Sequence, residues 1–166
     1  MQIIRDRRIS ESHWRHAPDG VLAGARSTKP SGAIIVTLAD WRRRKTELVR
    51  RAEPVGVRLG ADDDLDEIVA DLDSIALVAL EFGSFTEGRA YTYARKLRER
   101  HGYRGEIRAV GDVSRDRLAF MERCGFNAYE LRSDDDLQDA LNAFAEISDV
   151  YQPCADARPV IASRRA

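Results

Sequence analysis

The 166-residue chain is 43% hydrophobic and 33% charged, a composition that excludes a disordered chain and fits one domain with its own core. It has no apolar run of about 18 residues and no signal-peptide pattern, so we expect a cytoplasmic protein without a membrane span. The two cysteines, Cys124 and Cys154, are too few for a disulfide framework, which also favours a reducing compartment.

The net charge of −1 conceals an uneven distribution along the chain. Residues 1–60 carry 13 Lys and Arg against 6 Asp and Glu, whereas residues 61–166 carry 14 against 22. The ordinary interpretation is that the two halves attract and cover each other, and the alternative is a basic face for an acidic or phosphorylated partner. The basic run at 42–45 would spread around one helical turn, so we do not expect binding to nucleic acid.

The two ends of the chain have the least regular patterns. Short apolar pieces at 3–4 and 21–22 flank a Pro-Asp-Gly turn signal at 18–20. We therefore predict an N-terminal arm or hairpin within residues 1–33. Residues 149–166, which contain two prolines and a basic pair at 164–165, are predicted to be a C-terminal tail.

Between these ends the pattern alternates between strands and helices. Apolar, β-branched segments predict strands that begin at Ile34, Val55, Ile75, Ile107 and Ala128. Helical periodicity follows each of them, over 41–51, 64–72, 87–101, 114–124 and from 133 onward. Such repeating strand–helix units predict a single α/β domain, 1–166, with a mainly parallel sheet. We favour an open doubly wound sheet, with a half-barrel-like sheet as the alternative.

Capping residues mark the expected helix ends. Asp40 and Ser114 are predicted N-caps, and Gly102 and Gly125 are predicted to stop the helices that precede them. Ser133 stands three residues before an aspartate, a spacing that resembles a capping box.

Polar residues follow the last three predicted strands, at the edge where parallel α/β folds bind ligands. Each exit combines a carboxylate with an arginine. We predict that Glu81, Arg89 and Asp112 are catalytic and converge in one pocket. The later exits add Arg115 and Arg132 as predicted ligand-binding residues.

The loop at 82–89 is the most unusual segment, because it places phenylalanines, glycines and an arginine before a helix N-terminus. Free backbone N–H groups at that position, together with Arg89, would suit a small oxyanion such as phosphate, sulfite or carboxylate. We predict that Phe85, Thr86 and Gly88 contribute to ligand binding. The alternative is that the phenylalanines seal the core and Arg89 pairs with a nearby carboxylate.

Metal and cofactor signals are weak. Three strand-end carboxylates, Glu81, Asp112 and Glu130, could bind a divalent cation, but capping or pairing with arginine explains them more simply, and we predict no metal site. The chain lacks Cys-x-x-Cys and Gly-x-Gly-x-x-Gly motifs, so the sequence identifies no cofactor. Cys124 falls on the apolar stripe of its helix and is predicted to be a buried structural thiol.

Several contiguous segments of the chain resemble one bacterial family. They are LVALEFGSFTEGRAY at 77–91, YARKLR at 93–98, YRGEIRAVGDV at 103–113, DRL at 116–118 and RCGF at 123–126. The resemblance covers residues 33–147. That family is of unknown function and is labelled a probable oxidoreductase involved in sulfite reduction, because its genes lie beside sulfur assimilation genes. In the family's loop pattern, Glu-Phe-Pro-x-Phe-Thr-Asp-Gly-Arg, this chain has Gly83 for Pro and Glu87 for Asp.

The resemblance implies an accessory protein or oxidoreductase of assimilatory sulfate and sulfite reduction, with sulfite reductase components as partners. Since the chain lacks a cofactor motif, an oxidoreductase of this kind would borrow its cofactor from a partner. One alternative is a non-catalytic docking partner of the sulfite reductase machinery. The other is a metal-dependent lyase or isomerase of barrel type that uses the three strand-end carboxylates.

Overall fold

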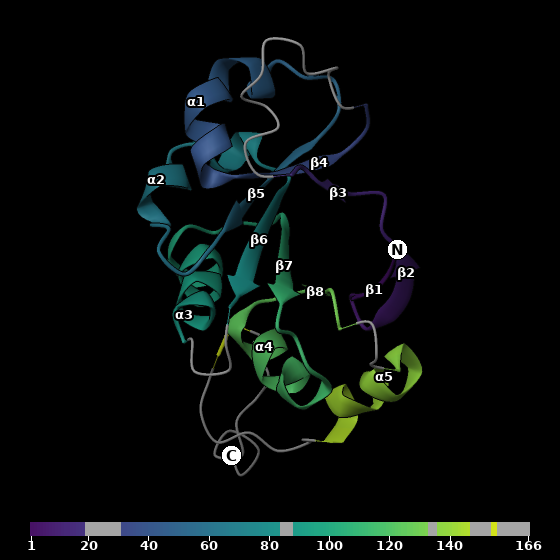
Figure 1. The fold of residues 1–166 in the computed structure, drawn as a ribbon. Coiled ribbons are helices and arrows are strands. Elements are labelled where there is room, and N and C mark those ends of the chain that lie inside the picture. Colours follow the sequence, from purple (N-terminus) through teal and green to yellow (C-terminus); the bar gives the residue numbers. More distant parts are fainter. Residues whose placement is uncertain (19–30, 84–87, 133–135, 147–153, 156–166) are drawn as a thin grey trace.

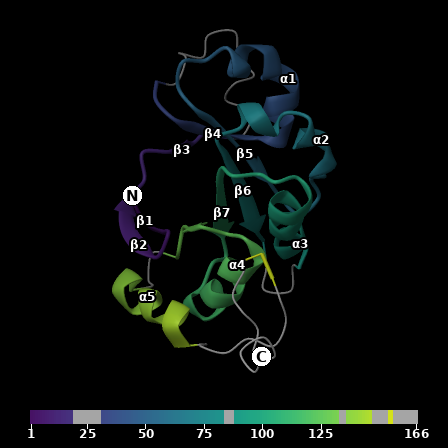
Figure 2. The ribbon, with the colours of Figure 1, turned by 180° about the vertical axis from the view of Figure 1, so that it is seen from behind.

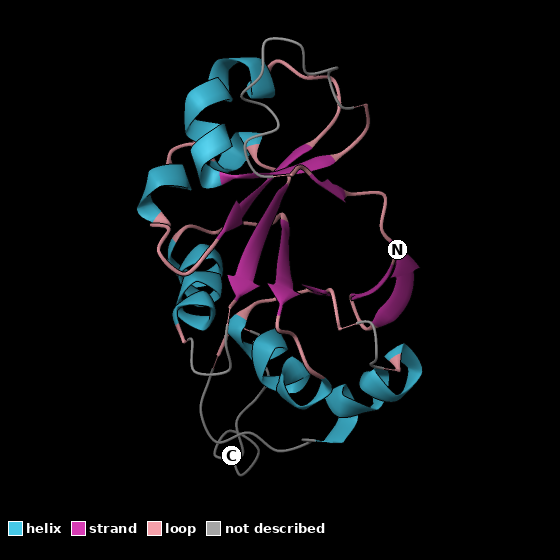
Figure 3. Ribbon diagram, viewed as in Figure 1, coloured by secondary structure: helices cyan, strands magenta, loops and turns pink. Residues whose placement is uncertain are grey.

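The computed structural model describes residues 1–18, 31–83, 88–132, 136–146 and 154–155. Figure 1 and Figure 3 show strands gathered in one sheet and helices between them. The strands are β1 (Gln2–Arg5), β2 (Arg8–Glu11), β3 (Arg15–His16), β4 (Ile34–Thr37), β5 (Val55–Leu59), β6 (Leu77–Phe82), β7 (Glu106–Gly111) and β8 (Ala128–Tyr129). The α-helices are α1 (Leu38–Val49), α2 (Asp66–Val69), α3 (Arg89–Arg95), α4 (Leu118–Cys124) and α5 (Leu137–Glu146). Shorter helical pieces are the 3₁₀ turns η2 (Leu72–Ser74) and η4 (Arg115–Arg117) and the π-helical η3 (Lys96–Arg100).

The sheet has the strand order β2-β1-β8-β7-β6-β5-β4-β3. From β3 to β8 each strand pairs in parallel with the next strand along the chain. Because this order never reverses, right-handed crossovers place the connecting helices on one face, as Figure 1 and Figure 2 show for α1 to α4. The sheet is therefore a curled half-barrel, and the half-barrel alternative, not the doubly wound sheet, is correct. The parallel order predicted for the five strands is confirmed.

The N-terminal segment belongs to this sheet. β1 and β2 form an antiparallel hairpin whose turn residues, Asp6 and Arg7, have φ values of 50° and 60°, as two-residue hairpin turns require. The other side of β1 pairs with β8, while β3 lies at the opposite edge beside β4. The N-terminal segment does form a hairpin, but its turn lies at residues 6–7 and its partner strand is β2. The predicted partner strand at 21–22 lies outside the described part of the chain.

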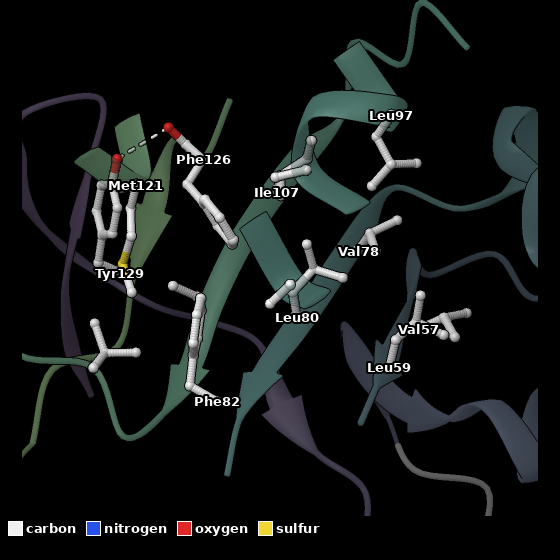
Figure 4. Close-up of a cluster of buried hydrophobic side chains, with 14 of the residues drawn as sticks. Val57, Leu59, Val78, Leu80, Phe82, Leu97, Ile107, Met121, Phe126 and Tyr129 are labelled. Atoms are coloured by element: carbon white, nitrogen blue, oxygen red, sulfur yellow. Dashed lines mark hydrogen bonds between the residues drawn. The ribbon is translucent and has the colours of Figure 1, made fainter. Parts of the chain in front are cut away.

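The main core lies between the sheet and the helices. Alternate residues of each strand point to this face, and Figure 4 shows how they meet side chains from η3, α4 and the loop after α4. The strand residues in that view are Val57, Leu59, Val78, Leu80, Phe82, Ile107 and Tyr129. The Tyr129 hydroxyl donates to the Phe126 carbonyl at 3.0 Å, so this buried phenol is satisfied.

Two helices differ from the sequence prediction, one in its first residues and one in its continuity. Thr37, not Asp40, is the N-cap of α1, and its Oγ1 accepts a hydrogen bond from the Asp40 amide at 3.2 Å. Asp40 instead lies in the first turn, where a carboxylate favours the helix dipole. The helix predicted over 87–101 is divided between α3 and the π-helical η3. The predicted capping box at Ser133 lies outside the described residues.

The glycine stops are confirmed, since Gly102 and Gly125 follow their helices with φ values of 62° and 113°. Ser114 occupies the N-cap position of η4, but its side chain makes no capping hydrogen bond. Among the described helices, none is both long and apolar enough to cross a lipid bilayer.

Candidate functional site

The exits of β6 and β7 lie side by side, because Phe82 and Gly111 are register partners at the ends of these strands. Gly111 turns the chain with a φ of 85°, and the next amide, that of Asp112, donates to the Phe82 carbonyl at 2.8 Å. A Cβ atom on residue 111 would lie 2.5 Å from that carbonyl oxygen. The glycine is therefore what allows Asp112 to sit against the exit of β6.

Two arginines face the Asp112 carboxylate. Arg117 Nη2 lies 3.5 Å from Asp112 Oδ2, and Arg132 Nη1 lies 3.4 Å from Asp112 Oδ1. The Arg117 side chain is only 10% exposed and packs over the Phe82 ring, and its Nε donates to Ser114 Oγ at 3.1 Å. Arg117 also donates to the Asp112 carbonyl oxygen, so its guanidinium is held in place by several groups.

Sequence reasoning missed Arg117. The residue lies two positions after Arg115, the last residue of the strand exit selected from the sequence. Nothing in the local pattern distinguishes it from the half-buried Arg115, because its burial depends on the Phe82 ring of β6.

Glu81 and Arg89 form a second group at the same end of the sheet. They line one small cavity together with Gly60 and Tyr93. Glu81 Oε2 lies 3.5 Å from Arg58 Nε, and Arg89 donates to the Ala61 carbonyl. Two of the three predicted catalytic residues thus line this cavity, whereas Asp112 does not line it and forms ion pairs with Arg117 and Arg132.

The predicted ligand-binding residues Gly88 and Arg115 do not line this cavity. Gly88 is the N-cap residue of α3 and has no side chain to cap it. Arg115 contacts α5, with Nε 2.6 Å from Asp139 and Nη2 2.5 Å from Glu146, so it joins η4 to that helix. Phe85 and Thr86 lie outside the described residues.

The inner face of the half-barrel, opposite the helices, holds a polar cluster that the sequence did not reveal. Arg108 is fully buried there and forms ion pairs with Glu106 at 2.6 Å and Glu130 at 2.7 Å. It also donates to Ser12 Oγ at 3.0 Å. His16 Nε2 lies 2.9 Å from the same Glu130. The cluster therefore connects the edge strand β3 with the residue that follows β8. Strand alternation could have assigned Arg108 to this face, because Ile107 and Ala109 point to the helices.

Glu130 is ionised more readily in this cluster than in water. Burial alone raises the pKa of its carboxyl, but hydrogen bonds and charges from His16 and Arg108 outweigh that effect, so the pKa lies below its usual value. Each of the three carboxylates considered as metal ligands is paired with an arginine, namely Glu81 with Arg58, Asp112 with Arg117 and Glu130 with Arg108. In the part of the chain that the structure describes, no three His, Cys, Asp or Glu side chains group as metal ligands.

The chain matches one known protein family over more than half of its length. Residues 56–161 match the family described as bacterial protein of unknown function (DUF934). The chain belongs to this family. No curated protein matches the chain. The match spans β5 to the last described residues and therefore includes all three strand exits of this DUF934 protein. The sequence resemblance to a bacterial family of unknown function is thus confirmed.

Proposed function

We propose that this DUF934 protein is an accessory protein of assimilatory sulfate and sulfite reduction that binds a small sulfur oxyanion at the exits of β6, β7 and β8. The observation that carries the proposal is the pair of guanidinium groups, Arg117 and Arg132, that face Asp112 at the edge of the sheet. The pathway comes from the resemblance described for residues 33–147.

The geometry of this pair suits an anion with several oxygens. Both ion pairs to Asp112, at 3.4 and 3.5 Å, are longer than the roughly 2.7–2.9 Å of a charge-assisted hydrogen bond. An oxyanion between the two guanidinium forks could make the shorter contacts. Because the Phe82 ring and Ser114 already hold Arg117, little side-chain freedom would be lost on binding. Arg89 stands at the previous exit and supplies a further cation to the same edge.

An accessory role agrees with the sequence better than a complete oxidoreductase. The chain carries no motif for a flavin, a nicotinamide or an iron–sulfur cluster. In this proposal a partner reductase supplies the electrons, and the DUF934 protein binds the anion that the partner reduces or releases.

Growth of a strain that lacks the gene tests the pathway. We expect slow growth on sulfate or sulfite as the sulfur source and normal growth on cysteine. Calorimetric titration of the purified protein with sulfite and sulfate, with phosphate for comparison, tests the site. Arg132→Gln should weaken binding about tenfold or more, as expected for losing one charge-assisted hydrogen bond of about 1.5–3 kcal/mol, while Arg104→Gln, an exposed site elsewhere, should not.

The outcomes separate the alternatives. Equal growth on all three sulfur sources would reject the pathway. A growth defect without any anion binding would favour the non-catalytic docking partner over the anion-binding protein.

A further inference from the structure

A second pocket is lined by residues of α3, of α4 and of the short described segment at 154–155. Figure 2 shows the ribbons of α3 and α4, which contribute most of this lining. It has a volume of about 290 Å³, and both cysteines of the chain line it. Cys124 ends α4 and is 2% exposed, whereas Cys154 is half-buried. Two guanidinium groups, from Arg95 and Arg123, line the same pocket.

The two thiols lie within reach of each other. Cys124 and Cys154 line the same pocket, although 30 positions separate them in the sequence. Both are free thiols in the structure. Two thiols that line one pocket can close into a disulfide if the chain adjusts and a disulfide oxidant reaches one of them.

We infer that Cys124 and Cys154 form a redox dithiol that exchanges with small anionic disulfides of the glutathione class and closes reversibly into an intramolecular disulfide. This site is separate from the strand exits, and it does not depend on the function proposed for them.

The surroundings assign a different role to each cysteine. Burial, followed by the nearby Cys154 charge, raises the pKa of Cys124 to about 12, so Cys124 stays protonated at neutral pH. Cys154 is the accessible thiol, and its negative charge when ionised is the largest cause that raises the pKa of Arg95. Arg95 lines the same pocket as Cys154, and its positive charge attracts an anionic reagent there. Cys154 is the attacking thiol and Cys124 is the resolving thiol.

The exchange balances in two steps. The Cys154 thiolate attacks one sulfur of glutathione disulfide, the disulfide bond breaks, and one glutathione thiolate leaves. Cys124 then loses its proton and attacks the Cys154 sulfur, and the second glutathione thiolate leaves. Two protein thiols become one disulfide, and glutathione disulfide becomes two glutathione thiols that take up both protons.

Intact-protein mass spectrometry in glutathione redox buffers tests the pair. The full chain should lose the mass of two hydrogens under oxidising conditions and regain it on reduction. Cys124→Ser should accumulate one glutathionyl group, because the resolving thiol is missing, and Cys154→Ser should stay unmodified. Cys124→Ala serves as a second variant if serine unfolds this buried position, with circular dichroism as the check. A wild-type chain that carries glutathionyl groups, or that links two chains, without an intramolecular disulfide would overturn the inference.

The preference for an anionic reagent is tested by rate. In the Cys124→Ala background, Arg95→Gln should slow the reaction of Cys154 with the anionic dithiobis(nitrobenzoate) several-fold and with a neutral dipyridyl disulfide much less. Arg104→Gln removes the same charge from an exposed position outside this pocket and should change neither rate. Equal effects of Arg95→Gln on both reagents, or no effect on either, would overturn the assignment of an anionic disulfide.

Discussion

Two structural features require a glycine at position 111, at the end of β7. Its φ of 85° lies in the left-handed region, and its Cα faces the backbone of Phe82 so closely that a methyl group has no room. Gly102 has a similar φ of 62°, but no atom would lie within 4 Å of a Cβ at that position. A side chain at position 111 would therefore cause both backbone strain and a steric clash, whereas a side chain at position 102 would cause backbone strain alone.

We predict that Gly111→Ala destabilises the protein by about 3 kcal/mol or more, the sum of left-handed strain and a forced backbone shift. Gly102→Ala should cost only the strain, about 1–2 kcal/mol. Urea unfolding of both variants measures the difference. Similar urea midpoints for the two variants would show that the backbone at the end of β7 can shift at little cost. Gly111 would then not be what fixes the position of Asp112.

Arg89 tests whether the shape of a cation matters at the exit of β6. Its guanidinium donates to the Ala61 carbonyl at the rim of the cavity that Glu81 also lines. If an oxyanion binds there, Arg89→Lys should impair growth of a deletion strain on sulfate, because an ammonium group cannot reproduce the planar fork. The melting temperature should stay unchanged. Full complementation by Arg89→Lys would leave the guanidinium without a functional role, and Arg104→Lys is the matched control.

At the level of elements, Arg98 shows how one side chain from a π-helical piece joins several turns. Its guanidinium donates to the carbonyls of Tyr103, Gly105 and Gly125 and to Asn127 Oδ1, at 2.7 to 3.1 Å. These acceptors lie before β7 and between α4 and β8, so Arg98 fixes the entrances of two adjacent strands.

Arg98→Met should destabilise the protein by about 2–4 kcal/mol, because it leaves several partly buried carbonyl groups without a donor. Arg100→Met in the same η3 segment is the control, and as an exposed position it should change stability by less than about 0.5 kcal/mol. Denaturant midpoints at constant slope provide the measurement. A small effect of Arg98→Met would mean that water replaces the guanidinium at these carbonyls.

The sequence predicts helices and strands well where burial determines the pattern of apolar residues. It predicts them poorly where a segment is a strand only because a distant segment pairs with it. The apolar runs of β4 to β7 gave the strands and their parallel order, because a strand buried on both faces has few other uses for β-branched residues. β2 and β3 are short and mostly exposed, and they form strands only because β1 and β4 pair with them. The π-helical η3 continues the apolar stripe of α3, so periodicity could not separate the two.

On the scale of the whole molecule, the chain crosses the open side of its own half-barrel. β2 and β3 are the two edge strands of the sheet, yet only residues 12–14 join them. Trp14 packs against Ile35, Leu77, Ala79 and Val110 on the inner face, beside the Arg108 cluster. This closure could not be predicted from the sequence, since His16 and Glu130 meet across 114 positions and neither lies in a recognisable motif.

The closure makes a pH-dependent contribution to stability. In the folded protein the pKa of Glu130 is lowered, because bonds and charges from His16 and Arg108 exceed the opposing effect of burial. The unfolded chain, with a glutamate pKa of about 4.3, binds this proton more readily. The contribution is therefore fully present above that pH, and it is lost as the pH falls through the lower folded pKa.

We predict that Glu130→Gln destabilises the protein at pH 7 by about 3 kcal/mol or more, since it leaves the buried Arg108 with one carboxylate fewer. The variant should also lose part of the stability change of the wild type between about pH 5 and pH 3, because glutamine does not titrate. Urea unfolding at several pH values, with the exposed Asp62→Asn as the control, measures both effects. If Glu130→Gln lowers stability equally at every pH, the carboxylate contributes through packing and not through its charge. The ion pairs around Arg108 would then not be what closes the open side of the half-barrel.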